Sequence, residues 1–587
     1  MNYNYKIWIF NVLLLINISL LESSKSYYGY VPKGNNALLY KPSVDPIMHL
    51  DQETFADTVF NQNEKAFLVE YYADWCGHCR AFAPFYRDFS YSVKEWSDIT
   101  VVAVMNCADP HNSQECRNNY VDHYPMLKYF PRSARNYKDG ILIQADHSVQ
   151  NLRRTLASKI LNEQQQVQYL NWPNFNYMDV TPTTQFNDLW NGLPISTEYL
   201  VIIFEHFDTV SPQFMLDLYK YRNRIGVRRA LSNSPLVPQL GIGSFPYVVT
   251  FKRDRQQAIF MDVYTPNTIN DILTLTSIQH IPQKPVQETF VTTPVPIKKP
   301  GRDCARNPES CKALYYASET DMLKAMRMAL YDEILRTDGY IQGSNLTNLH
   351  QFVQLLSQHF PVTTFHNAIR RQRRSVSSTL KHSDRARFVF KHLNEFLSSR
   401  ISNGALSIGD WKNQFESIER LYSYPFPQNA TWQHCVGSEP QYRGYTCGLW
   451  TTFHTLTVHT YLDTVKEGPI DVLKPLKAIQ GWVSSFFGCL HCRNHFMHMT
   501  TTLFPMNERR VRHKHDIMMY LWRAHNIVNN RLHGDITEDP YFIKYQFPPI
   551  FLCPTCHAGG NFSRRQVRNF LLRYYGNIKP HVRMAHK

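Results

Sequence analysis

Continuous hydrophobic runs, separated by more polar stretches, mark the first half of the chain. Residues 66–73 and 100–105 have the unbroken apolar character of buried strands. A similar run at 199–205 and a strand-like stretch at 243–251 come later. The first run ends in a short polar segment, after which we expect a helix to begin near Ala81. The pattern predicts two α/β units, one after the other.

The second half of the chain is predicted to be helical. Apolar residues recur at helical spacing in 315–330, and 346–360 and 388–397 continue the trend. Between the halves, 281–300 is rich in Pro, Thr and Lys, which is typical of an extended, semi-rigid linker. If redox centres lie on both sides of this linker, one must travel to meet the other.

The N-terminus has the composition of a secretory signal peptide. Lys6 precedes the apolar run 7–16, and small residues follow at Ser23, Ser24 and Ser26. The alternative, an uncleaved anchor, is disfavoured because the run is shorter than the roughly 20 residues of a membrane span. We therefore expect the signal peptide to cover 1–26 and the protein to be secreted or to reside in the ER or Golgi lumen, without a stable membrane span. Sequons for glycosylation stand at Asn345, Asn429 and Asn561.

Net charge adds little to this picture. The 63 Lys and Arg residues exceed the 48 Asp and Glu residues by 15, and these charges are spread along the chain. Only 370–374 is a dense basic run; it resembles a dibasic processing site, but we expect an exposed loop. Because no nucleic-acid-binding signature accompanies the charge, a solvated surface is expected and no nucleic-acid partner.

The twelve cysteines fall into six local pairs. Three of these are CxxC motifs: Cys76/Cys79, Cys489/Cys492 and Cys553/Cys556. Two-residue loops lock little of the unfolded chain, so redox work or metal binding explains them better than a structural framework does. For the other three pairs we expect structural disulfides; they are Cys107/Cys116, Cys304/Cys311 and Cys435/Cys447.

The first CxxC pair lies where a predicted strand meets a predicted helix. A helix N-terminus stabilises a thiolate, so Cys76 is expected to be the exposed nucleophile and Cys79 the resolving thiol. His78 between them would make the disulfide more oxidising. Farther on, Tyr124-Pro125 before an alternating strand is a candidate cis peptide bond. Residues 75–79 and 124–127 together resemble a thioredoxin fold of the protein disulfide isomerase type.

Aromatic and imidazole side chains accompany the second CxxC pair at helical spacings. Trp450 and His454 are four apart, as are the histidines on either side of Cys492, His491 and His495. Trp522, His525 and Asn529 also share one helix face. Flat rings and hydrogen-bonding groups around a dithiol favour a planar redox cofactor. The alternatives are ordinary core aromatics with surface histidines, or a zinc site that uses Cys489/Cys492 with Cys553/Cys556.

These C-terminal residues closely resemble the Erv/ALR flavin-linked sulfhydryl oxidase domain, and the domain order resembles the quiescin sulfhydryl oxidase family. The resemblance implies FAD held noncovalently in a helical bundle and no metal. The sequence departs from the family at His491, where acidic or polar residues are usual, and at Phe547, where tryptophan is common. The FAD contacts that carry over by position are Arg443, Trp450, His454, His491, His495, Trp522, His525, Asn526, Val528, Asn529, Lys544 and Phe547.

The expected fold class is multidomain, with two thioredoxin-like α/β domains, then a helical domain and an Erv/ALR FAD-binding helical bundle. The expected bounds are a redox-active thioredoxin domain at 44–162, a redox-inactive copy at 165–285, a linker at 286–312, a helical domain at 313–420, an Erv/ALR domain at 421–560 and a tail at 561–587.

The resemblance implies a thiol oxidase that puts disulfides into client proteins. Electrons would pass from a client dithiol to Cys76/Cys79, then to Cys489/Cys492, to FAD and to O2, giving hydrogen peroxide. The bond between domains is expected to join Cys76 to Cys489. Cys553/Cys556 is a further candidate redox pair whose place in the path stays open. Expected partners are reduced or unfolded secretory proteins and O2; the alternative function is a disulfide isomerase-like chaperone without flavin.

Overall fold

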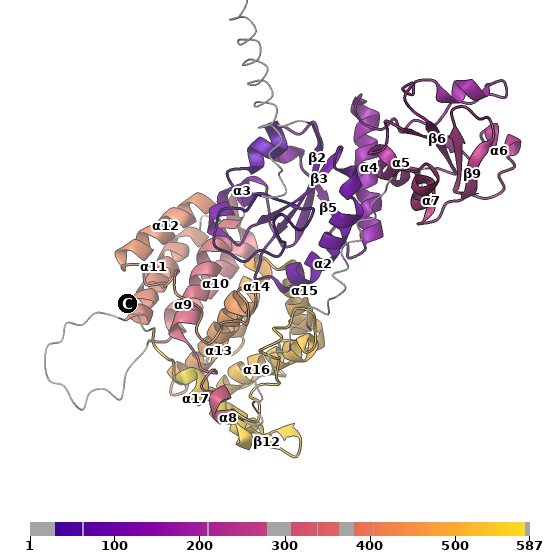
Figure 1. Ribbon diagram of the computed structural model, residues 1–587. Helices are drawn as coiled ribbons and strands as arrows, with labels where there is room; N and C mark the ends of the chain where they lie inside the picture. The colour runs from indigo at the N-terminus through magenta and orange to yellow at the C-terminus, as the bar shows by residue number, and fades with distance from the viewer. Residues whose placement is uncertain are drawn as a thin grey trace, which may run out of the picture.

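The computed structural model describes residues 30–581, except 62–63, 208–209, 279–303, 305–306, 337–338, 363–380 and 403 (Figure 1). The predicted signal peptide, the first part of the predicted linker and the basic run 370–374 lie outside the described residues. The described chain forms two α/β units followed by a helical half, as the hydrophobic pattern predicts.

The first α/β unit is a five-stranded mixed sheet. In the order β1-β3-β2-β4-β5, β1, β3 and β2 run parallel, while β4 and β5 are antiparallel to their neighbours. Every residue of β2 and β3 is buried, which explains their continuous apolar sequences. The elements are β1 (Met48–His49), β2 (Ala66–Tyr72), α2 (Gly77–Ser92), β3 (Thr100–Asn106), α3 (Ser113–Asn118), β4 (Met126–Phe130), β5 (Ile141–Ile143) and α4 (Val149–Val167).

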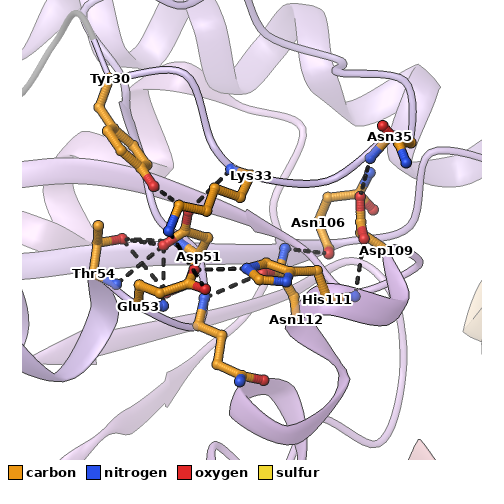
Figure 2. Close-up of polar contacts among 11 residues, drawn as sticks. Tyr30, Lys33, Asn35, Asp51, Glu53, Thr54, Asn106, Asp109, His111 and Asn112 are labelled. Carbon is orange, nitrogen blue, oxygen red and sulfur yellow. Dashed lines mark hydrogen bonds and ion pairs between the residues drawn. The ribbon is translucent and has the colours of Figure 1, made fainter.

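The segment before β1 belongs to this unit. The Tyr30 hydroxyl donates a hydrogen bond to the Asp51 carboxylate, and the backbone N–H of Asn35 donates to Asp109 Oδ2 at 3.0 Å (Figure 2). The backbone N–H of Asn36 donates to the same oxygen at 3.2 Å. Because residues 30–43 are fastened to the sheet edge in this way, the unit begins earlier than the predicted boundary at 44.

The second unit repeats this topology in shorter form. Its sheet has the order β7-β6-β8-β9, with β6 parallel to β7 and antiparallel to β8. Arg153 of α4 forms an ion pair with Asp217 of α5 at 2.8 Å, which joins the two units. The elements are β6 (Tyr199–Glu205), α5 (Ser211–Tyr219), β7 (Ile225–Leu231), α6 (Leu236–Gln239), β8 (Tyr247–Lys252), β9 (Ala258–Val263) and α7 (Thr268–Leu275).

The helical half consists of two groups of helices that share one core with the first unit. Helix α10 packs on α11 and α14, and α9 packs on α13, so the groups are joined along their length. The first group is α8 (Pro308–Lys312), α9 (Glu319–Arg327), α10 (Gly343–His359), α11 (His382–Ile401) and α12 (Ile408–Leu421), with strands β10 (Tyr340–Gln342) and β11 (Ala405–Ser407). The second is α13 (Gly444–Thr464), α14 (Lys474–Phe486), α15 (Leu490–His498), α16 (Lys514–Leu532) and α17 (Arg564–Gly576), with β12 (His557–Ala558) and β13 (Asn561–Phe562).

Helix α17 lies in the stretch that the sequence predicts to be a tail. It packs against α13 and α16, so the second helical group extends beyond residue 560. Within the described residues, no helix has both the length and the hydropathy that a membrane crossing requires.

Candidate active site

Cys76 and Cys79 lie where β2 gives way to α2. Cys76 is the N-cap of α2, and both sulfurs are free thiols. Burial opposes ionisation of Cys76, but hydrogen bonds from the Cys79 thiol and from the backbone N–H groups of Cys79 and His78, with the charge of Arg80, lower its pKa overall. Burial, and then the bond to Cys76 and its charge, raise the pKa of Cys79 well above the usual value. Of the two thiols, Cys76 is therefore the one that ionises more readily.

The prediction that Cys76 is exposed is wrong for this arrangement of the chain. The side chain is fully buried because the second helical group covers the CxxC motif of the first unit. Arg80, one residue past the motif, donates to the backbone oxygens of Gln441 at 2.9 Å and Thr537 at 3.1 Å in that helical group.

Cys489 and Cys492 form a disulfide at the start of α15, with Cys489 as the N-cap. Cys489 is fully buried, whereas Cys492 is partly exposed to a cavity in the helical half. The two cysteines of this disulfide thus face different neighbours. Cys489 lies toward the first α/β unit and Cys492 lines the cavity.

The loop before Cys489 pairs through its backbone with the cis-proline loop of the first unit. Tyr124, which precedes the cis peptide bond to Pro125, donates its N–H to the Gly488 oxygen at 2.9 Å and forms a β-bridge with Cys489. The ring of Trp75, next to Cys76, stacks on Phe487 at 5.6 Å between centroids. The loop that carries Cys489 therefore lies against the cis-proline loop of the first unit, with Cys76 and Cys489 buried in the same interface.

A cavity of about 330 Å³ extends from this interface between α13, α15 and α16. Nine of the twelve predicted FAD contacts line it: Arg443, Trp450, His491, His495, His525, Val528, Asn529, Lys544 and Phe547. His525 stacks on Trp450 at 3.9 Å with their planes 6° apart, and burial holds the pKa of His525 well below the usual value. A neutral imidazole and an indole thus form one flat wall.

The other three predicted contacts, Trp522, Asn526 and His454, do not line the cavity themselves. They form hydrogen bonds to residues that do, namely Phe547 and His525. Trp522 Nε1 and Asn526 Nδ2 donate to the Phe547 oxygen at 2.5 and 2.9 Å, and the Phe547 N–H donates back to Asn526 Oδ1 at 2.8 Å. His454 shares a 2.9 Å hydrogen bond with His525. These side chains orient residues that line the cavity.

Arg443 and Lys544 are among the cations that line the cavity without an ion pair in the described part of the chain. Burial, and then the charge of Arg443, lower the pKa of Lys544 to about 8, and burial likewise lowers the pKa of Arg443. A desolvated cation is costly unless an anion compensates it. Two such cations beside flat aromatic walls and a disulfide fit a planar cofactor that carries phosphates, and FAD is such a molecule.

Comparison with known proteins agrees with this arrangement. Residues 46–153 match the thioredoxin family and residues 447–548 match the Erv1/Alr family. Sulfhydryl oxidase 1 of Rattus norvegicus is 29% identical over 532 residues, covering 89% of this chain and 64% of the relative. Sulfhydryl oxidase 2 of Homo sapiens is 26% identical over 562 residues, covering 92% of this chain and 74% of the relative.

The chain has the domain combination of the quiescin sulfhydryl oxidases. Among solved structures, the sulfhydryl oxidase fragment of human QSOX1 is 28% identical, covers 45% of this chain and 98% of the fragment, and gives a TM-score of 0.37. The chain spans slightly less than two thirds of the length of the rat relative.

The cavity of the Erv1/Alr domain also has walls that the sequence did not indicate. Tyr574 and Tyr575 from α17 line it, as does Tyr315 from the segment before α9. His454 stacks on Tyr575 at 4.9 Å. Tyrosines at 574 and 575 lie outside the residues matched to the family, so only the amphipathic pattern of α17 could have pointed to them.

The remaining cysteines are paired as disulfides. Cys107 joins Cys116, Cys304 joins Cys311, and Cys435 joins Cys447. Cys553 joins Cys556, and both are buried in a cluster with Trp522 and α17; neither cysteine lines the cavity. Cys489/Cys492 and Cys553/Cys556 are thus two separate disulfides, and the described residues do not gather them into one four-cysteine site. Asn345, Asn429 and Asn561 are exposed.

Proposed function

We propose that this chain is an FAD-dependent thiol oxidase that introduces disulfides into client proteins and reduces O2 to hydrogen peroxide. The observation that carries the proposal is the pairing of Tyr124 with the Gly488–Cys489 loop, beside the stacking of Trp75, the neighbour of Cys76, on Phe487. An isomerase-like chaperone would have no need of a second CxxC pair docked in this position.

The thioredoxin domain would take electrons from clients. A client thiolate attacks the Cys76 sulfur of the Cys76–Cys79 disulfide and expels Cys79 as a thiolate. A second client thiolate then attacks the client sulfur of this mixed disulfide, releasing Cys76 and an oxidised client. Two electrons and two protons pass from the client to the Cys76/Cys79 pair. Clients must reach Cys76, so this step requires the two domains to separate.

The docked arrangement would serve the next exchange. The Cys76 thiolate attacks the Cys489 sulfur and expels Cys492 as a thiolate. Cys79 then attacks Cys76, which frees Cys489 and restores the first disulfide. Burial raises the pKa of Glu70, which lies beneath the motif, to about 8. The ionised form of this carboxyl raises the pKa of Cys79 through its charge and is the form that accepts the Cys79 proton.

The cavity residues would hold the cofactor beside Cys492. Trp450 and His525 present flat surfaces for a ring system, and Arg443 and Lys544 present charges for a diphosphate. The chemistry that bound FAD supplies is two-electron oxidation of a dithiol coupled to reduction of O2 to hydrogen peroxide. Cys492, partly exposed to the cavity, is the thiol that faces the cofactor.

Client proteins of this oxidase would be reduced or unfolded proteins of the secretory pathway or the extracellular space. The five disulfides of the described chain and the three exposed sequons are those of an oxidising compartment. Cys553–Cys556 is buried and does not line the cavity, so the proposed path does not include it.

The test is the visible absorption of the purified full chain before and after a dithiol is added without oxygen. We expect a flavin spectrum that bleaches and returns with air, with release of peroxide. Cys76→Ser should lose oxidation of protein thiols and keep oxidation of a small dithiol, which can reduce Cys489–Cys492 directly. A colourless protein that is inert to oxygen would overturn the proposal and favour an isomerase; full protein-thiol oxidation by Cys76→Ser would overturn the path.

A further inference from the structure

The first helical group carries no redox cysteine, yet two of its charged residues reach the junction of the two CxxC motifs. Glu333 follows the helical turn η8 (Met328–Asp332), and Arg336 ends the turn η9 (Ile334–Arg336). Their side chains are 4% and 6% exposed and form an ion pair at 3.3 Å. A buried ion pair is costly to desolvate, so this pair calls for a role beyond general stability.

Glu333 forms a hydrogen bond to the loop that carries Cys489. Its Oε2 accepts the Gly488 N–H at 3.1 Å, while the oxygen of the same glycine accepts the N–H of Tyr124 at 2.9 Å. Gly488 is thus fixed on one side by the helical group and on the other by the cis-proline loop. Neither bond would survive a shift of this loop by one residue.

Arg336 joins the same two loops through their backbone oxygens. Nη2 donates to the Phe486 oxygen at 2.8 Å, two residues before Gly488. Nη1 donates to the oxygen of Asp122, two residues before Tyr124. One guanidinium therefore bridges the approach to Cys489 and the approach to the cis-proline, and its rigid fork fixes the distance between them.

We propose that Glu333 and Arg336 are positioning residues that align Cys76 with Cys489 for exchange between the domains. This inference rests on the proposed function, because alignment matters only if the two pairs exchange. In this proposal, the first helical group binds both redox loops and fixes their positions relative to each other. The sequence of the group does not indicate this role. Both residues act through hydrogen bonds to the backbones of the two redox loops.

The alignment can be measured without flavin or oxygen. In a Cys79→Ser/Cys492→Ser background, Cys76 and Cys489 keep their thiols, and glutathione disulfide oxidises them to one interdomain disulfide with release of two glutathione thiols. At half-formation, the square of the glutathione concentration divided by the glutathione disulfide concentration gives the effective concentration of the two thiols. Added to this background, Arg336→Gln should lower the effective concentration roughly 10- to 100-fold, as expected for loss of charged hydrogen bonds.

Matched variants separate alignment from stability. Arg327→Gln breaks two ion pairs of the same helical group, to Glu419 at 3.1 Å and to Asp332 at 3.8 Å. It removes no bond to either redox loop and should leave the effective concentration unchanged. Glu333→Gln keeps an oxygen for the Gly488 N–H and should stay near the background value, whereas Glu333→Ala should lose at least tenfold. Thermal unfolding of each variant checks that the helical group is intact.

The outcomes are distinct. Equal effective concentrations for Arg336→Gln and the background would overturn the inference, as would an equal loss in Arg327→Gln. If the full chain neither binds flavin nor consumes oxygen, the proposed function fails, while the glutathione titration still reports whether Glu333 and Arg336 align the two cysteines.

Discussion

The ring of His78, between the cysteines of the thioredoxin motif, stacks on the ring of His491, between the cysteines of the second motif. Their centroids are 4.3 Å apart and their planes differ by 6°. His147 lies 5.0 Å from His78, and His495 lies 4.4 Å from His491. Four imidazoles from two domains thus lie together where the domains dock. Protonation of the two stacked rings would place like charges side by side, so this arrangement requires neutral rings.

The first prediction is that acid weakens docking. Burial, and then the charges of His491, His147 and His495, lower the pKa of His78 to about 4 in the docked chain, against about 6.5 for a free histidine. Docking is therefore fully favoured above pH 6.5 and is lost progressively as the pH falls toward 4. At pH 5 the docking equilibrium should weaken several-fold, because His78 is only half-buried and solvent screens part of the effect. Interdomain disulfide formation between Cys76 and Cys489, measured from pH 4.5 to 7.5, checks this.

A variant separates this effect from titration of the thiols. The charge of Arg531 disfavours protonation of both His491 and His495, and His498 disfavours protonation of His495. Asp535 favours protonation of His491. His491→Gln removes the stacked imidazole and keeps these neighbours, so its pH profile should be flatter below pH 6. An identical profile in this variant would assign the acid sensitivity to the thiols instead.

The second prediction concerns Lys544, one of the cations that line the cavity. Lys544→Met should weaken FAD binding roughly 10- to 100-fold, because a charged hydrogen bond contributes about 1.5–3 kcal/mol. Since the pKa of Lys544 is lowered to about 8, FAD affinity in the parent chain should also fall as the pH rises through 8. Flavin fluorescence titrations measure both effects. Lys477→Met, at an exposed position of α14, is the control and should bind normally.

The main elements could be predicted because their sequences show their burial. The run 66–73 corresponds to β2 (Ala66–Tyr72), in which every residue is buried. Trp450 and His454 share one helix, as do Trp522 and His525, because helical spacing is a local property. The second α/β unit is likewise visible as a repeat of strand-like runs.

Contacts between distant segments leave no such local trace. Nothing in the sequence around Glu333 or Arg336 indicates that they bind the loop before Cys489. The burial of Cys76 follows from docking of another domain, whereas its place at a strand–helix junction predicts exposure. The sequence places Tyr575 in a predicted tail, because the cavity that this residue lines exists only after α17 packs on α13.

The third prediction is that Glu70 lowers the stability of the folded first domain at neutral pH but speeds the oxidation of protein thiols. Burial raises the pKa of this carboxyl to about 8, and the Tyr40 hydroxyl donates a hydrogen bond to it. A raised pKa favours the folded state below the unfolded value of about 4.5, and this advantage is lost as the pH rises to 8. Glu70→Gln should therefore stabilise the domain by roughly 3 kcal/mol at pH 7 and by little at pH 4. Denaturant unfolding at both pH values measures this.

The same substitution should slow catalysis, since the amide of a glutamine side chain cannot accept a proton from Cys79. Oxidation of protein thiols should fall several-fold in Glu70→Gln, while oxidation of a small dithiol by Cys489/Cys492 is unchanged. A variant that is less stable at pH 7 than the parent would contradict the assignment of Glu70 as a strained buried acid.

The fourth prediction is that α17 belongs to the cofactor-binding domain. Leu571 on this helix is fully buried, so Leu571→Ala should cost about 2–5 kcal/mol and release flavin at lower temperature. Arg573→Ala, on the exposed face of α17, should change neither. Flavin release followed by fluorescence during heating makes the comparison, and equal release temperatures for Leu571→Ala and the parent would show that α17 does not support the cavity.

The fifth prediction uses the tight fit of Gly488 between the domains. A Cβ atom at this position would lie 2.9 Å from the Tyr124 ring and 3.0 Å from Glu333 Oε2, so Gly488→Ala must push the loops apart. Overpacking of this kind costs about 1–3 kcal/mol, or roughly five- to a hundredfold in docking. Oxidation of protein thiols should fall by that factor, while oxidation of a small dithiol, which bypasses Cys76, should persist.

Gly468 provides the matched control for this substitution. A Cβ atom there meets nothing within 4 Å, so Gly468→Ala should oxidise both kinds of substrate at the parent rate. Comparing the ratio of the two rates in the three proteins removes differences in flavin content. If Gly488→Ala keeps the parent ratio, electrons reach Cys489 without the Tyr124–Gly488 pairing, and the docked arrangement is not the one in which the two cysteine pairs exchange. If the ratio falls in Gly488→Ala alone, the space between these two loops limits electron transfer in this chain.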